Sequence, residues 1–137
     1  GADLFMLLIL TLAFLSYSPV WTGFLCRLIL STVYVSGALY KIVDPKWNNG
    51  SQFQTMIDSP NTFVRPWPIW LRNSLCLSMA GWLTIAFEGI AGLTIWCPKL
   101  TIPTVILGTI FHLGIEYFQR IPFFSWISIA LLVGCLL

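Results

Sequence analysis

The sequence predicts an all-α protein: a polytopic transmembrane helical bundle with four to five spanning helices and one long interfacial loop. Hydrophobic residues make up 58% of the 137 residues and charged residues only 9%, whereas soluble domains carry about 25% charged residues. Apolar stretches close to the roughly 17–25 residues that cross a bilayer recur between short polar segments. Seven Trp and ten Phe suit two membrane interfaces, because aromatic rings gather at headgroup level.

The first two spans are predicted at Leu4–Tyr17 and Phe24–Val43, with a short turn at residues 18–23 between them. Arg27 lies near the start of the second span and Lys41 near its end, so both side chains can reach toward headgroups. Small residues along this second span favour close helix packing.

The one long polar stretch is Asp44–Pro68, which holds five prolines or glycines that break regular structure. Within it, Gln52–Ile57 is predicted to form a short interfacial helix with its apolar residues on one side. The sequence Asn-Asn-Gly at residues 48–50 predicts a turn.

Three further segments follow the polar stretch. Ile69–Trp96 is longer than one crossing, so we expect an interfacial turn around Trp70–Asn73 and a span that begins at Leu75. Thr101–Phe118 is the next span, and Phe123–Leu137 is a shorter fifth apolar segment. The whole chain, 1–137, is predicted to be a single transmembrane domain.

Charge excludes one class of partner and predicts an orientation. The net charge of +2 and the lack of a basic run speak against nucleic acid. With five spans, four cations share the side of the N-terminus and two share the other side. The first group is Lys46, Arg65, Arg72 and Arg120, and the second is Arg27 and Lys99. The positive-inside rule then places the N-terminus and the long loop in the cytoplasm.

Three polar positions inside apolar segments are the candidate site residues. Lys41 is either a base or a cation paired with Asp44 or lipid phosphate. Glu88 lies deep in an apolar helix, where a carboxyl group is protonated, paired or facing a cavity. A bond to His112 or Arg72 is the structural interpretation of Glu88, and proton or quinone chemistry is the functional one.

His112 has several open interpretations: a general acid or base, a haem or chlorophyll ligand, a quinone hydrogen-bond donor, or a satisfied interhelical hydrogen bond. Thr109, His112 and Glu116 share one helix face. Glu116 is expected either to orient His112 or to reach the interface with Arg120. No metal site is expected, because one His lacks the further ligands that metal sites need and the four cysteines show no metal-binding spacing.

Three blocks of the sequence resemble the HTTM family, the horizontally transferred transmembrane domain shared with vitamin K-dependent γ-carboxylases. The first block is YVSGALYKIVDPKWNNG at residues 34–50. The second is WLTIAFEGIAGLTI, around Glu88, and the third is FHLGIEYFQRIPFFSWISIALL, which begins at Phe111. Their order and spacing are similar to the family pattern from about Arg27 to the end. DoxX-like membrane families are similar in outline.

The resemblance implies roles for particular residues. Lys41 matches the lysine proposed as the base in the carboxylase, with Glu88 and His112 as further acid or base groups. Trp47 and His112 are the candidate cofactor-binding residues, and a quinone is the implied cofactor. Compared with the family pattern, this sequence has one extra residue between Lys41 and Trp47. Family members also have further spans before this region, and the animal carboxylase has a large lumenal domain.

Three functions remain open at this point. The leading expectation is a structural or accessory subunit of a larger membrane complex, such as a quinone-using electron-transfer or photosynthetic assembly. Its partners would be the lipid bilayer and other membrane subunits, and its location a bacterial inner membrane. The second is a carboxylase-like or quinone-linked redox enzyme that uses Lys41, Glu88 and His112. The third is a peptide or toxin maturation helper.

Overall fold

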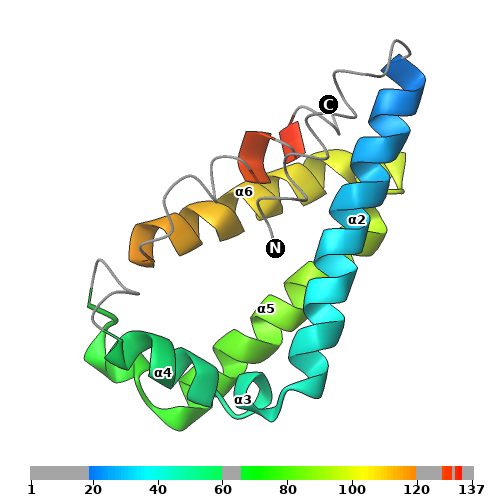
Figure 1. The fold of residues 1–137 in the computed structure, drawn as a ribbon. Coiled ribbons are helices and arrows are strands. Elements are labelled where there is room, and N and C mark those ends of the chain that lie inside the picture. The colour runs from blue at the N-terminus through cyan, green and yellow to red at the C-terminus, as the bar shows by residue number, and fades with distance from the viewer. Residues whose placement is uncertain (1–18, 60–65, 120–127, 131, 134–137) are drawn as a thin grey trace.

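A computed structural model describes residues 19–59, 66–119, 128–130 and 132–133, and in these residues the chain is helical (Figure 1). Three long helices dominate: α2 (Pro19–Val43), α5 (Ser74–Thr94) and α6 (Thr101–Phe118). Short elements connect them, listed in chain order: α3 (Pro45–Asn48), α4 (Ser51–Asp58), η1 (Ile69–Leu71) and η2 (Pro98–Leu100). The all-α prediction is therefore confirmed for the described residues.

The three long helices are each long and apolar enough to cross a membrane, over Gly23–Val43, Ser74–Thr94 and Pro98–Phe118. They match three of the predicted spans. The predicted first span, Leu4–Tyr17, lies outside the described residues. Of the predicted fifth, Phe123–Leu137, only residues 128–130 and 132–133 are described, and they are helical.

The start of α2 corrects the predicted turn at residues 18–23. Residues from Pro19 onward are helical, so the turn does not extend to Thr22 and Gly23. Proline suits the first position of a helix because its fixed φ is already helical and its missing N–H would have had no intrahelical acceptor.

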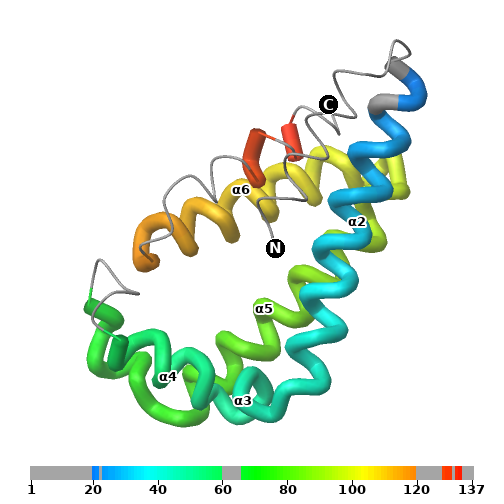
Figure 2. Tube along the Cα trace, viewed as in Figure 1, coloured from blue at the N-terminus to red at the C-terminus, as the bar shows by residue number. Residues whose placement is uncertain are grey.

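The described residues that follow α2, up to Ser59, form two short helices, α3 and α4, within the segment predicted as an interfacial loop. Asp44 caps α3 by accepting a 3.0 Å hydrogen bond from the Lys46 backbone N–H. Gly50 adopts a left-handed conformation with φ of 79°, which confirms the turn predicted at residues 48–50. The predicted short helix Gln52–Ile57 is also confirmed as α4, whose Phe53 is buried. Figure 2 shows the chain turning from α2 through α3 and α4 to lie beside α5.

The helix α3 lies directly on α5. A Cβ placed on Gly81 would collide with the backbone carbonyl of Trp47. Three residues earlier on α5, the Ser78 hydroxyl donates to the Asn48 carbonyl. Glycine at position 81 therefore allows the backbone of α3 to touch the backbone of α5, in the way that small residues permit close approach of membrane helices.

The helices α2 and α5 form the main interface. The Ser31 hydroxyl donates a 2.7 Å hydrogen bond to the Gly92 carbonyl. A buried cluster from α2, the end of α5, α6 and the last described helical residues packs beside it: Leu30, Tyr34, Ala91, Ile95, Val105 and Leu132. The start of α2, the end of α5 and the start of α6 thus share one end of the molecule (Figure 1).

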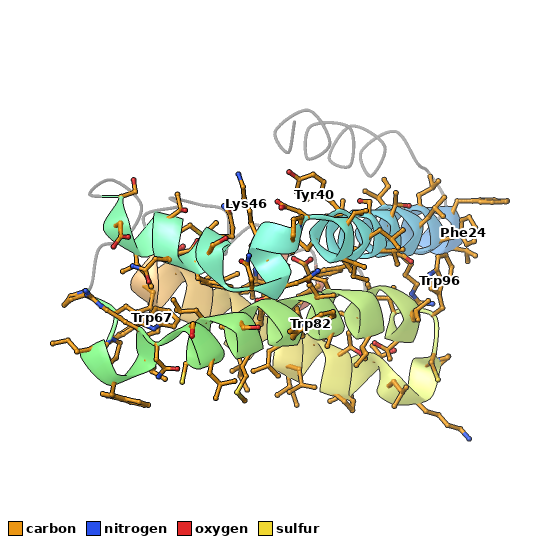
Figure 3. The ribbon with its side chains drawn as sticks, turned by 90° about the horizontal axis from the view of Figure 1, so that it is seen from below. Phe24, Tyr40, Lys46, Trp67, Trp82 and Trp96 are labelled. Atoms are coloured by element: carbon orange, nitrogen blue, oxygen red, sulfur yellow. The ribbon has the colours of Figure 1, made fainter. Side chains whose placement is uncertain are left out.

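The outer faces of the long helices are apolar. On α5 the exposed large side chains include Leu75, Met79, Trp82, Leu83, Ile90 and Leu93, and on α6 they include Ile102, Ile106, Leu107, Ile110, Leu113 and Tyr117. Figure 3 shows Trp82 on such a face. Exposed apolar surface on this scale indicates a membrane or protein environment rather than water.

Candidate functional site

The candidate site centres on an ion pair between α2 and α5. The Lys41 ammonium lies 2.6 Å from Oε2 and 2.8 Å from Oε1 of Glu88, so it donates to both carboxylate oxygens. The two side chains are only 15% and 14% exposed. Lys41 lies in the last turn of α2. Glu88 lies well inside α5, about 20 Å from the first residue of that helix, Ser74, at a rise of 1.5 Å per residue. Charges this enclosed are stable because they are paired.

Gly37 leaves room for this pair. A Cβ at position 37 would lie 3.1 Å from Glu88 Oε2 and 3.5 Å from the Lys41 nitrogen. Gly37 is one turn before Lys41 on the same face of α2. The Glu88 carboxylate therefore rests over the backbone of α2, where a larger side chain would push it away.

Trp47 covers the pair from α3. The Lys41 ammonium lies 5.0 Å from the centroid of the Trp47 ring, within the range of a cation–π interaction. The same ring packs edge-on against Phe53, with centroids 5.5 Å apart. Trp47 thus has a defined position beside Lys41, and it is one of the two residues that the sequence nominated for cofactor binding.

A second polar pair joins α2 to α6. The Tyr34 hydroxyl and His112 Nε2 share a 2.8 Å hydrogen bond, and the two residues are 6% and 3% exposed. Phe87 of α5 packs against the Tyr34 ring at 6.0 Å and stacks on Phe111 at 4.1 Å. His112 is therefore a buried interhelical link, which is one of the interpretations that the sequence left open.

The structure corrects the expected partners of two residues. Glu88 binds Lys41, so the expectation that it binds His112 or Arg72 is wrong. Lys41 is paired across helices with Glu88, not with Asp44, whose side chain caps α3 instead. Arg72 donates a 3.0 Å hydrogen bond to the Trp67 carbonyl.

The structure tests only one of the two roles expected of Glu116, the orientation of His112. Its Oε2 atom is buried and has no hydrogen-bond partner there, so it does not orient His112 through a hydrogen bond. Arg120, its other expected partner, lies outside the described residues.

The sequence interpretation did not include Tyr34 or Gly37 among the candidate site residues. A usable signal was present, because Tyr34, Gly37 and Lys41 are separated by three and four residues and share one face of a helix. That spacing predicts that the helix whose side chain binds Lys41 also packs near Tyr34. It does not reveal that His112, 78 positions away from Tyr34, supplies the hydrogen bond.

The hydrogen bonds between Lys41 and Glu88 limit what Lys41 can do as a base. A lysine acts as a base through a free nitrogen lone pair, whereas the Lys41 ammonium is directed at both oxygens of Glu88. Base chemistry at Lys41 would first require the ammonium to give up a proton, to Glu88 or to another acceptor. Within the described residues, no three His, Cys, Asp or Glu side chains lie close enough together to hold a metal ion.

Comparison of the chain with protein-family models, with curated proteins and with solved structures finds no match.

Proposed function

We propose that the chain is an integral membrane protein of HTTM type that serves as a structural or accessory subunit of a larger membrane complex. The observation that carries the proposal is that each candidate catalytic group is bonded to a side chain of another helix. Lys41 and Glu88 join α2 to α5, and His112 joins α6 to Tyr34 of α2. Groups held in this way fix the positions of helices.

The outer surface supports the same proposal. Three helices are long and apolar enough to cross a bilayer, and large apolar side chains line their outer faces. Such faces can pack against lipid or against the helices of partner subunits. A quinone-using electron-transfer or photosynthetic assembly in a bacterial inner membrane is the host that we propose.

Gentle solubilisation of native membranes tests this function. The chain should migrate in native electrophoresis with other subunits, in a fixed ratio that is the same in two unrelated mild detergents. A chain that is always monodisperse and alone, at 15.5 kDa plus detergent, would end the accessory-subunit proposal. Cross-linking in intact membranes before solubilisation separates true loss of partners from detergent effects.

An enzyme is the second candidate, and one observation favours it. The Tyr34–His112 and Lys41–Glu88 pairs lie about 10 Å apart along one face of α2, given seven residues at 1.5 Å each. Intramembrane titratable groups that cluster in this way are typical of proton or quinone chemistry. The variant Lys41→Ala should then abolish turnover of an added quinone, while Lys46→Ala, an exposed lysine on α3, should not. Equal activity of both variants would rule out this candidate.

A further inference from the structure

Arg27 is a cation in the first half of α2 that takes no part in the Lys41–Glu88 ion pair. Its Nε atom is buried and meets no hydrogen-bond acceptor among the described residues, and no described carboxylate pairs with it. Lys41 and Arg72, in contrast, donate to Glu88 and to the Trp67 carbonyl. Arg27 as a whole is only half-buried, so part of the residue reaches the surface although Nε does not.

Among the described residues, the end of the molecule that holds Arg27 carries positive charge and no acidic side chain. Lys99, exposed on η2, lies at this same end. The described acidic residues lie elsewhere: in the capping turn before α3, at the end of α4, within the ion pair, and in the last turn of α6. They are Asp44, Asp58, Glu88 and Glu116. An anion that neutralises Arg27 must therefore come from outside the described part of the chain.

Aromatic rings mark this end as a headgroup region. Trp21 packs edge-on against Phe24 with centroids 6.1 Å apart, and Phe24 packs against Trp96 at 5.6 Å. Figure 3 shows Phe24 and Trp96 together at one end of the molecule and Trp67 at the other. Tryptophan collects at the level of lipid headgroups. Arg27 lies about 6 Å inside the apolar span that begins at Gly23, a depth from which an arginine can extend to phosphate.

We propose that Arg27 binds the phosphate of an anionic phospholipid in the leaflet at this end, with Lys99 adding attraction from the rim. The proposal rests on the membrane location proposed above. Guanidinium is suited to phosphate because several N–H groups can donate to its oxygens at once. The Nε atom of Arg27 is buried, and Trp21 and Trp96 lie at the same end of the molecule.

Native mass spectrometry of the full chain, purified in detergent, tests the site. The chain is titrated with phosphatidylglycerol or with phosphatidylcholine, and the first bound lipid is measured. The wild-type chain should bind phosphatidylglycerol about fivefold more tightly, as one cation near a membrane surface provides. Arg27→Gln should lose this preference, Arg27→Lys should keep part of it, and the matched control Lys46→Gln, at the opposite end, should keep it all.

Several results would overturn the proposal. Equal binding of the two lipids by the wild-type chain would do so without any variant, so a variant that folds poorly leaves the test intact. Displacement of phosphatidylglycerol by an equal concentration of inorganic phosphate would identify free phosphate as the ligand instead. Unchanged selectivity in Arg27→Gln alongside loss of a co-purifying subunit would identify a protein carboxylate. Extraction of the wild-type chain from membranes by alkaline carbonate would refute the membrane location itself, independently of Arg27.

Discussion

Removing one member of the Lys41–Glu88 pair should destabilise the helix bundle, whereas removing both should restore most of the stability. The Lys41 ammonium contacts the two Glu88 carboxylate oxygens at 2.6 and 2.8 Å. The two side chains are only 15% and 14% exposed. A buried charge that loses its partner costs about 3–5 kcal/mol, whereas replacing both charges by uncharged groups of similar volume is often neutral.

The two single variants should differ. Lys41→Met leaves the carboxylate without its cation, and uptake of a proton limits the cost, so we expect a loss of about 3 kcal/mol. Glu88→Gln keeps one acceptor oxygen for Lys41 and should cost less, about 2 kcal/mol. The double variant Lys41→Met/Glu88→Gln should fall within about 1 kcal/mol of wild type, which gives a favourable coupling energy between the two positions.

Reversible unfolding in mixed micelles, followed by circular dichroism as a denaturing detergent is added, measures these free energies. Lys46→Met is the matched control: Lys46 is exposed one helix later, so its loss should cost less than about 0.5 kcal/mol. If the two single losses simply add in the double variant, or if Glu88→Gln behaves like Lys46→Met, the pair does not link α2 to α5.

The same unfolding assay tests two further contacts. Gly81→Ala should cost more than about 2 kcal/mol, since its methyl group would strike the Trp47 carbonyl and overpacking costs about 1–3 kcal/mol or more. Its control, Gly114→Ala, meets no atom within 4 Å and should stabilise α6 by about 0.5 kcal/mol; similar effects of both alanines would contradict the close approach of α3 and α5. Tyr34→Phe removes the 2.8 Å hydrogen bond to His112 and should cost about 1 kcal/mol of stability. If Tyr34→Phe costs the same in a His112→Phe background, the two side chains are not coupled.

Local pattern was enough to predict most of the described helices. The apolar run from Thr101 to Phe118 predicted α6 with its observed bounds. The predicted start of the preceding span, Leu75, is one residue from the observed Ser74. These predictions depend on length, hydropathy and helix-breaking residues, which act within a few turns of the chain.

Partners across helices could not be predicted in the same way. The spacing on α2 shows that Tyr34 and Lys41 share a face, but it contains no information about which face of α5 or α6 lies opposite. Glu88 and His112 were both nominated, and only the angle and depth at which α5 and α6 pack decide that Glu88 meets Lys41 while His112 meets Tyr34. Helix packing angles depend on contacts distributed over whole surfaces, which a single sequence does not display.

The most direct test of the account is whether Lys41 and Glu88 touch in a bilayer. Solid-state NMR on the reconstituted chain, with ¹⁵N in the lysine ammonium groups and ¹³C in the glutamate carboxylates, measures that contact. The chain has three lysines and two glutamates, so assignment by single substitution is feasible. We expect one lysine signal to be dephased strongly by a carboxylate carbon within about 4 Å, and we expect Glu88→Gln to abolish this effect. A spectrum in which no lysine is dephased, or in which the effect survives Glu88→Gln, would contradict the ion pair on which the proposed role depends.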